Sequence, residues 1–296
     1  MSAGIRRGML AAALRGARSL GPGRAGAARF IFSLLSADGG FRGRGEASDL
    51  YYTAFALGAL SALEEDLPAA SAGYIRSFGD GATLDLVHLS CLARSWAELI
   101  ERSSDRAPPA AARAILERVE AHRAGDGGYS LFPRSPGGSA YGCFLALGAY
   151  QDMEAAPPRP EGIEACLRTL DLVGPCANER SVPVPSTLAT AAAAVVLAEI
   201  GRPPPPGAGS WLAGGIDGGG FRAFPGAPEP DLLSTASAIH ALAVLGAIPA
   251  GAGGAVRDFV MGLRDGEGGF KGHREDEADA EYTFYALLAL GHGGPP

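Results

Sequence analysis

The sequence is poor in charged residues and in cysteine, and each shortage excludes a class of protein. Charged residues make up 19% of the 296 residues and hydrophobic residues 47%, which is too apolar for a disordered chain. The four cysteines include no Cys-x-x-Cys pair and suggest no disulfide framework, so we expect a reducing, cytoplasmic setting. No apolar run reaches the roughly 18 residues of a transmembrane segment. The net charge of −7 argues against nucleic acid as a partner.

Glycine, by contrast, is abundant, and much of it stands in a recurring Asp-Gly turn. The four clear copies begin at Asp38, Asp126, Asp217 and Asp265. The first two gaps are nearly twice the last, so a degenerate copy is expected inside each, and candidates begin at Asp80 and Asp171. The completed series has a period of 42 to 48 residues. A nearly fixed period of this size indicates a repeat architecture.

Each repeat has the same two predicted helices. An amphipathic helix precedes the turn, as in Ile163, Cys166, Leu167 and Leu170, which are spaced i, i+3, i+4, i+7. The turn then ends that helix, and a helix that is apolar on nearly every face follows a polar loop. The clearest such helices are 51–63, 141–150, 190–200, 235–245 and 282–290. Because a helix that is apolar all round is buried on both sides, these should form an inner layer and the amphipathic helices an outer one.

Two layers of repeated helix pairs form either an open solenoid or a closed ring. Apolar inner helices and a last repeat without a polar cap favour the ring. We therefore predict an all-α protein, an α/α toroid of about six helix–helix repeats, occupying residues 28–296. Residues 1–27 are predicted to be a basic, helical N-terminal segment that packs on the ring or serves as an interaction arm. The apolar run Met9–Leu14 is short for the core of a targeting signal.

Two segments carry a resemblance to a known family. DGGFRGRGEASDLYYTAFALGAL and DGEGGFKGHREDEADAEYTFYALLALG resemble the prenyltransferase and squalene-oxidase repeat of prenyltransferase β subunits and squalene–hopene cyclases. The shared pattern is a Gly-Gly-Phe turn, an Asp, and an aromatic-Thr pair that opens an Ala/Leu-rich helix. The resemblance covers about residues 30–291 and implies the toroid fold. The repeated Asp, present as Asp49, Asp231 and Asp279, also has a purely structural interpretation, because Asp caps helix N-termini.

Prenyltransferase β subunits hold a catalytic zinc through an Asp, a Cys two residues later and a His from the last repeat. The Asp positions match Asp231 and Asp279, but the Cys position is Leu233 and the His position is Tyr282. Because Leu cannot ligate a metal and neutral Tyr is a poor ligand, we predict no cofactor and no zinc. Two carboxylates alone would suit magnesium better, and magnesium stays possible.

The cyclase group protonates an alkene with an Asp-x-Asp-Asp acid, a string that is absent here. The nearest feature is an acidic run that ends in Asp279 and Glu281. Crowded carboxylates raise one another's pKa, and a protonated carboxyl can act as a general acid. Asp279, Asp231 and Glu281 are the candidate catalytic residues. The alternative is a solvated loop in which Asp279 only caps a helix.

Basic and aromatic residues near the inner-helix starts are the candidate substrate-binding residues. Arg42, Arg44, Lys271 and His273 follow Gly-rich turns and could cradle a diphosphate, although they equally suit a plain turn with solvated charges. Tyr52, Tyr141, Tyr282 and Tyr285 could line a cavity and stabilise an isoprenoid or a carbocation, although core packing explains them as well.

These observations support two functional hypotheses. The first is a prenyltransferase-like protein that binds an isoprenoid, an isoprenoid diphosphate or another lipid in the ring and transfers or cyclises it without zinc. The second is a non-catalytic scaffold whose ring binds a protein. The resemblance implies a helical-repeat protein partner under both. A further alternative is a class II terpene cyclase-like enzyme with an atypical acid.

Overall fold

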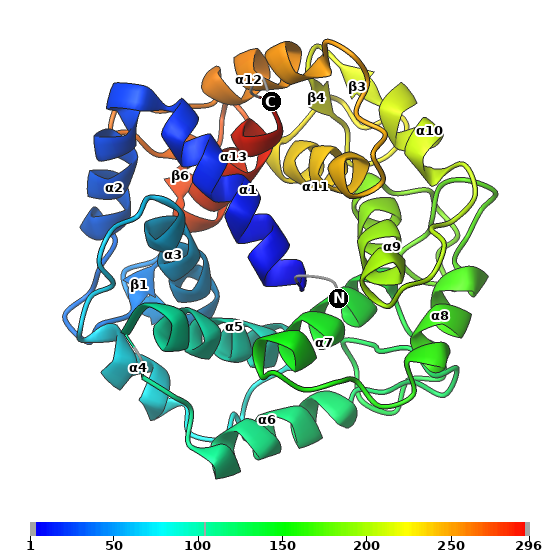
Figure 1. Cartoon of the computed structure of the whole chain (residues 1–296), viewed down its shortest axis with the longest axis horizontal. Helices are drawn as coiled ribbons and strands as arrows, with labels where there is room; N and C mark the ends of the chain where they lie inside the picture. The colour runs from blue at the N-terminus through cyan, green and yellow to red at the C-terminus, as the bar shows by residue number, and fades with distance from the viewer. Residues whose placement is uncertain (1–3, 104, 294–296) are drawn as a thin grey trace.

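The structure, a computed structural model, describes residues 4–103 and 105–293. Viewed along its shortest axis, the molecule is a ring of two concentric helical layers (Figure 1). The inner layer consists of α3 (Leu50–Ala62), α5 (Leu86–Ser103), α7 (Ala140–Asp152), α9 (Thr187–Glu199), α11 (Leu232–Val244) and α13 (Ala280–Gly293). Each inner helix contacts the next along the chain, and α13 returns to contact α3, so the ring is closed.

The outer layer surrounds this ring. Its helices are α2 (Arg24–Ser33), α4 (Ser71–Ser77), α6 (Pro109–Glu120), α8 (Pro160–Thr169), α10 (Ala208–Gly214) and α12 (Ala252–Met261). Each outer helix precedes one inner helix, which makes six pairs within the described residues. The predicted α/α toroid and its two layers are confirmed. The first outer helix begins at Arg24, inside the segment that we assigned to the N-terminal extension.

The only strands of the described chain are three two-residue ladders beside the glycine-rich turns. They are β1 (Phe41–Arg42) with β2 (Ser48–Asp49), β3 (Ile216–Asp217) with β4 (Gly220–Phe221), and β5 (Phe270–Lys271) with β6 (Ala278–Asp279). Each pair is antiparallel. Phe41 pairs with Asp49 and Phe270 with Asp279, so equivalent positions of the first and last repeats share one register.

A threonine one turn into the inner helix ties the aromatic residue of the turn to that helix. The Oγ1 of Thr235 donates to Asp231 O at 2.6 Å and accepts from the Phe221 amide N–H at 2.9 Å. Thr53 and Phe41 repeat this arrangement at 2.9 Å. Because these groups are buried, the hydroxyl satisfies a backbone donor that would otherwise be unpaired. The threonine of the repeat therefore has a structural role.

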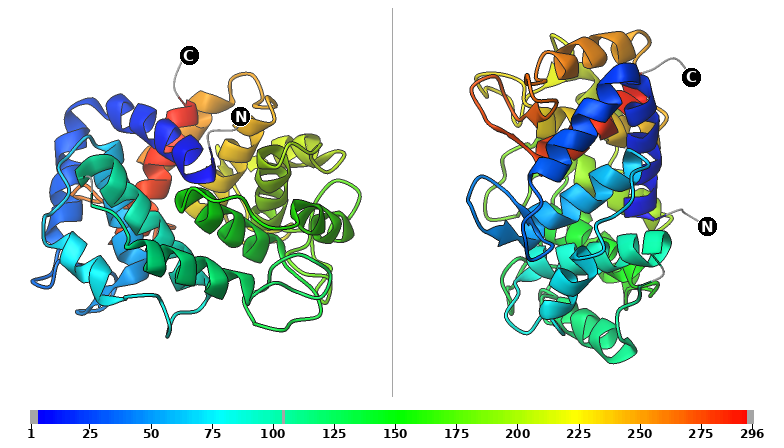
Figure 2. Two further views of the ribbon diagram at one scale, coloured as in Figure 1. Left: turned by 60° about the horizontal axis from the view of Figure 1, so that its bottom comes forward. Right: turned by 90° about the vertical axis from the view of Figure 1, so that its left-hand side faces the viewer.

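The N-terminal helix α1 (Ile5–Ser19) lies across one face of the ring, where α13 also ends (Figures 1 and 2). It crosses α13 at very short range, because a Cβ at Gly16 would lie 1.9 Å from Leu287 O and one at Gly291 would lie 1.8 Å from Ala12 O. Only glycine permits this approach. The buried Arg6 then pairs with Glu98 near the end of α5, so α1 covers the C-terminal ends of the inner helices.

Candidate functional site

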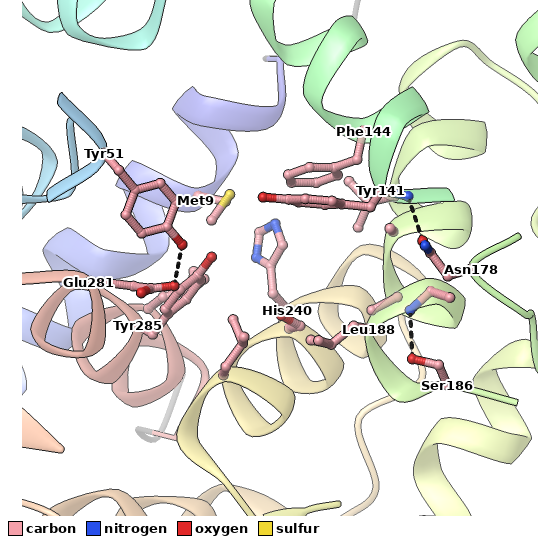
Figure 3. Close-up of a pocket in the computed structure, with 17 residues that line it drawn as sticks. Met9, Tyr51, Tyr141, Phe144, Asn178, Ser186, Leu188, His240, Glu281 and Tyr285 are labelled. Carbon is pink, nitrogen blue, oxygen red and sulfur yellow. Dashed lines mark hydrogen bonds between the residues drawn. The ribbon is translucent and has the colours of Figure 1, made fainter. Parts of the chain in front are cut away.

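A cavity of about 430 Å³ occupies the centre of the ring (Figure 3). Its walls come from α3, α7, α9, α11 and α13, and Met9 of α1 closes its inner end. The lining residues are Met9, Tyr51, Tyr141, Phe144, Asn178, Ser186, Leu188, Ala189, Ala191, Ala192, Val195, Leu233, Ser237, His240, Glu281, Tyr285 and Leu288. The volume falls within the range of pockets that bind small organic molecules.

The lining follows from the helix caps. Asp49, Ser139, Ser186 and Asp231 are N-caps whose side chains accept backbone N–H groups, and Asp279 accepts the Tyr282 N–H in the same way. The predicted capping role of Asp49, Asp231 and Asp279 is thus confirmed. The residue two positions after each of the five caps lines the cavity, and these residues are Tyr51, Tyr141, Leu188, Leu233 and Glu281.

Two further layers of lining residues lie deeper in the cavity. Residues six positions after the cap are Ala192, Ser237 and Tyr285, and residues nine positions after it are Val195, His240 and Leu288. Positions 2, 6 and 9 are spaced i, i+4 and i+7, which places them on one helix face. The cavity is therefore a stack of layers that runs from the inner-helix N-termini toward α1.

The two sides of the cavity wall differ in polarity. The helices α9 and α11 contribute a largely apolar side that includes Leu188, Ala192, Val195 and Leu233. Aromatic rings from α3, α7 and α13 line the remainder, and the carboxyl group of Glu281 lies among them. Neither Arg nor Lys is among the described residues that line the cavity. Such a site suits an apolar molecule that carries few polar groups.

Glu281 and Tyr51 form the polar centre of the cavity. The Tyr51 hydroxyl donates to Glu281 Oε1 at 2.5 Å, across the interface between α3 and α13 (Figure 3). Burial raises the pKa of Glu281 to about 7, against the lowering effect of the Tyr51 hydrogen bond. Burial also raises the pKa of Tyr51 far above its usual value, so this phenol stays neutral. Glu281 is therefore a carboxyl group that can carry a proton near neutral pH.

A pair of imidazoles lies deeper. His240 points into the cavity (Figure 3). Its Nδ1 lies 3.0 Å from Nε2 of His292 on α13. Burial lowers the pKa of His240 to about 4 and that of His292 to about 3, which leaves both rings neutral at pH 7. One ring must donate to the other, so the pair can hold or relay a proton but adds no positive charge.

Three of the residues predicted from sequence line the cavity, namely Tyr141, Glu281 and Tyr285. Tyr52 and Tyr282 do not. They pack instead on the glycines of their own turns, since a Cβ at Gly43 would lie 2.1 Å from the Tyr52 ring and one at Gly272 would lie 2.3 Å from the Tyr282 ring. The cavity-facing position is one residue earlier, because consecutive residues of a helix point about 100° apart.

The two candidate aspartates also lie outside the lining. Both carboxylate oxygens of Asp231 bind Ser234, at its amide N–H and its hydroxyl, each at 2.7 Å. Asp279 caps α13 through Oδ1, while its buried Oδ2 lies 3.5 Å from Nε of Arg44. Burial raises the pKa of Asp279 to about 6. These carboxyl groups cap the N-termini of α11 and α13 and do not line the cavity.

The predicted diphosphate cradle is not assembled around the cavity. Arg44 pairs with Asp276 at 3.0 Å and faces Asp279, and the exposed Arg42 donates to Ser33 O. His273 lies 3.9 Å from Asp276. Neither Lys271 nor His273 is among the described residues that line the cavity. The basic side chains thus lie on the turns, where two of the four meet acidic neighbours.

Sequence reasoning missed three residues of the cavity lining, namely Met9, Asn178 and His240. Met9 belongs to the N-terminal segment, and nothing in its pattern indicates that it closes a cavity. Asn178 comes from the following repeat, where its Oδ1 accepts the Tyr141 amide N–H at 3.1 Å. His240 could have been found from its position nine residues after the Asp231 cap, in register with Val195 and Leu288.

Within residues 4–103 and 105–293, no three His, Cys, Asp or Glu side chains form a cluster suited to a metal ion. In the same ranges, no helix combines the length and the apolar character that crossing a membrane requires.

The closed double ring and its central cavity define a toroid with a small-molecule-sized site. The family model described as the prenyltransferase alpha-alpha toroid domain matches residues 21–92 and 208–291, which is more than half of the chain. The chain therefore belongs to this family, as the repeats predicted. No curated protein matches it.

Similar solved structures share the fold at low identity. A protein from Actinoplanes is 18% identical with a TM-score of 0.62, over 92% of this chain and 97% of that one. The type II terpene cyclase MstE from Scytonema, in complex with geranylgeranyl dihydroxybenzoate, is 13% identical with a TM-score of 0.61, over 94% and 97%. An inactive variant of the GH76A alpha-1,6-mannanase from Salegentibacter sp. HEL1_6, in complex with alpha-1,6-mannotriose, is 15% identical with a TM-score of 0.60, over 92% and 98%. These likenesses establish the toroid alone.

Proposed function

We propose that this protein binds an uncharged isoprenoid-type lipid in the central cavity and isomerises it by proton transfer from Glu281. The observation that carries the proposal is a carboxyl group of raised pKa, hydrogen-bonded to Tyr51, in a cavity whose other walls are mostly apolar and aromatic. Apolar walls bind a hydrocarbon chain by the hydrophobic effect. The lack of Arg and Lys among the described lining residues favours an uncharged ligand over a diphosphate.

The chemistry requires no second substrate. The O–H bond of protonated Glu281 breaks, the π electrons of a ligand double bond form a C–H bond with that proton, and a carbocation remains on the ligand. The rings of Tyr141, Phe144 and Tyr285 can stabilise this cation. Loss of a proton from the ligand to neutral His240, or back to Glu281, ends the reaction. The product is an isomer of the substrate, and the Tyr51 hydroxyl stabilises the Glu281 carboxylate in the meantime.

The mannanase likeness does not favour a glycosidase. Glycoside hydrolysis generally needs two carboxyl groups that flank the scissile bond. Glu281 is the only carboxyl group among the described residues that line the cavity, and most of the remaining wall is apolar. A sugar would leave many hydroxyl groups without partners against Ala192, Val195 and Leu233.

Native mass spectrometry of protein purified from its own cells tests the binding step. We expect a bound lipid of a few hundred daltons on the wild type. Ala192→Phe fills the cavity and should lose the lipid, whereas Ala110→Phe, a matched change on the exposed face of α6, should keep it. Farnesol and farnesyl diphosphate are each titrated into the wild type and into Ala192→Phe, and the binding that depends on the cavity should be tighter for the alcohol. A wild type that carries no lipid and binds neither probe would favour the scaffold hypothesis.

The catalytic step has a separate test. Glu281→Gln keeps the shape of the side chain but removes its acidic proton. The variant should bind the co-purified lipid as the wild type does, yet form none of its isomer when incubated with it. Undiminished conversion by Glu281→Gln would refute the assigned acid and leave the binding proposal intact.

A further inference from the structure

A second cleft, of about 530 Å³, lies on the outside of the ring between the end of α6 and the start of α8. It shares no lining residue with the central cavity. We call it the outer cleft and define it by Glu120, Arg123, Arg134 and Arg159, with Ser135 and Gly125 between them. Three guanidinium groups and one carboxylate therefore surround one open volume.

The Glu120 carboxylate accepts hydrogen bonds from several side chains around the outer cleft. It accepts from Nε of Arg123 at 2.6 Å and from Nη2 of Arg159 at 3.1 Å. It also accepts from the hydroxyls of Tyr129 at 2.8 Å and Tyr150 at 3.0 Å. Arg123, which follows α6, and Arg159, the N-cap residue of α8, thus share one acceptor, which holds their positive charges near each other before any ligand binds.

The three arginines differ in the donors that they still have available. The N–H donors of Arg123 are already occupied, because it also donates to Tyr129 Oη and to the carbonyls of Gly127 and Pro158. Arg159 makes one bond, to Glu120, and its side chain is 65% exposed. No described residue pairs with the guanidinium of Arg134, which is exposed. Arg134 and Arg159 therefore line the cleft with guanidinium donors that meet no acidic partner except Glu120 among the described residues.

The backbone conformation of Arg134 and Arg159 is unusual. Arg134 has φ of 61° and Arg159 has φ of 53°, in the left-handed region that side chains other than those of Gly, Asn and Asp seldom adopt. The other non-glycine residues in this region are Glu64 and Glu154, which follow the ends of helices α3 and α7, where such a conformation is common, and Val173, which lies in an exposed loop. Strained residues cluster at binding sites, and both arginines line one cleft.

From this geometry we propose that the outer cleft is a binding site for a small molecule with a phosphate or diphosphate group. Glu120 neutralises one of the three guanidiniums, which leaves two positive charges in a chain whose net charge is −7. Two charges match a phosphate dianion, and the planar guanidinium fork matches phosphate oxygens better than a point charge does. The cleft volume leaves room for the rest of the molecule.

Isothermal titration with inorganic pyrophosphate, at about 50 mM salt to limit screening, tests this proposal. The cleft variant is Arg134→Gln/Arg159→Gln. The matched control is Arg113→Gln/Arg180→Gln, which removes the same charge from exposed positions outside the cleft. We expect the cleft variant to bind at least about tenfold more weakly and the control to stay within about twofold of the wild type. All four positions are exposed, so both proteins should fold.

Two results would overturn the proposal. Equal weakening in both variants would mean that pyrophosphate responds only to overall charge, and no measurable binding by the wild type would mean that the cleft holds no phosphate. Malonate, a dicarboxylate that carries two negative charges at neutral pH, serves as a chemical control. It should bind clearly more weakly than pyrophosphate, and equal affinity would refute the assignment to phosphate.

Discussion

Nη1 of Arg6 lies 2.8 Å from Oε1 of Glu98, and this buried ion pair fastens the N-terminal helix across one face of the ring. Nε of Arg6 also lies 2.9 Å from Asp152 at the end of α7. The side chain of Arg6 is 6% exposed and that of Glu98 is 1% exposed, so neither charge can turn to solvent. The position of Met9 at the inner end of the cavity depends on this anchor.

Replacing Arg6 should therefore lower the free energy of unfolding. Arg6→Met leaves buried Glu98 without its ion-pair partner and leaves Asp152 with only the charge of Arg94 acting on it, and we expect the free energy of unfolding to fall by about 3 kcal/mol or more. The neighbouring Arg7, whose side chain is 57% exposed, pairs with Glu101 at the surface, and Arg7→Met should change it by less than about 0.5 kcal/mol. Urea unfolding of both variants measures this. Equal losses would show that Arg6 contributes no more than a surface pair.

The threonine that ties each turn to its inner helix gives a second prediction. Thr235→Val keeps the shape but leaves the Phe221 amide N–H without its acceptor, so the free energy of unfolding should fall by about 1–3 kcal/mol. Thr235→Ser keeps the hydroxyl and should lose only about 0.8 kcal/mol, for one methyl group. The ordering of the two variants in urea unfolding is the decisive measurement. If valine proved no worse than serine, the hydroxyl would have no structural role.

Glu281 should make stability depend on pH. Its pKa of about 7 in the folded protein exceeds the ordinary 4.5. Between these values the folded state holds a proton that the unfolded state has lost, so stability falls as pH rises through this window. We expect the wild type to lose on the order of 2 kcal/mol relative to Glu281→Gln from pH 4.5 to 7.5, allowing for the partial exposure of the carboxyl. Unfolding curves of the two proteins that shift in parallel would contradict a raised pKa.

We also predict that the purified protein carries no zinc. Leu233 stands at the position of the zinc thiolate and lines the cavity, and Tyr282, at the position of the imidazole, packs on Gly272. Elemental analysis after purification without chelator should give less than about 0.1 zinc per chain, since the remaining oxygen ligands bind zinc weakly. Stoichiometric zinc that a chelator removes would contradict this. His273, whose charge acts on Asp231, would then be the first residue to mutate.

Much of the fold could be predicted from local patterns. Asp-Gly turns, amphipathic outer helices and apolar inner helices recur with one period, so the pattern of each repeat predicts the same pair of helices. The caps at Asp49, Asp231 and Asp279 were predicted for the same reason, because N-capping depends only on residues within one helical turn. Predicting Tyr52 and Tyr282 as wall residues failed by a single position, since the rotation of a helix cannot be read from its composition when every face is apolar.

The sequence by itself thus determines the repeat, its two helices and the helix starts, since these depend on contacts within about 50 residues along the chain. Only the tertiary structure decides the site. Tyr51 and Glu281 are separated by 230 residues, and they meet because α13 closes the ring on α3. Arg6 reaches Glu98 and Asp152 only once the ring has formed, which brings Met9 to the end of the cavity. The raised pKa of Glu281 follows from that closure as well, because burial is its main cause and burial exists only in the assembled ring.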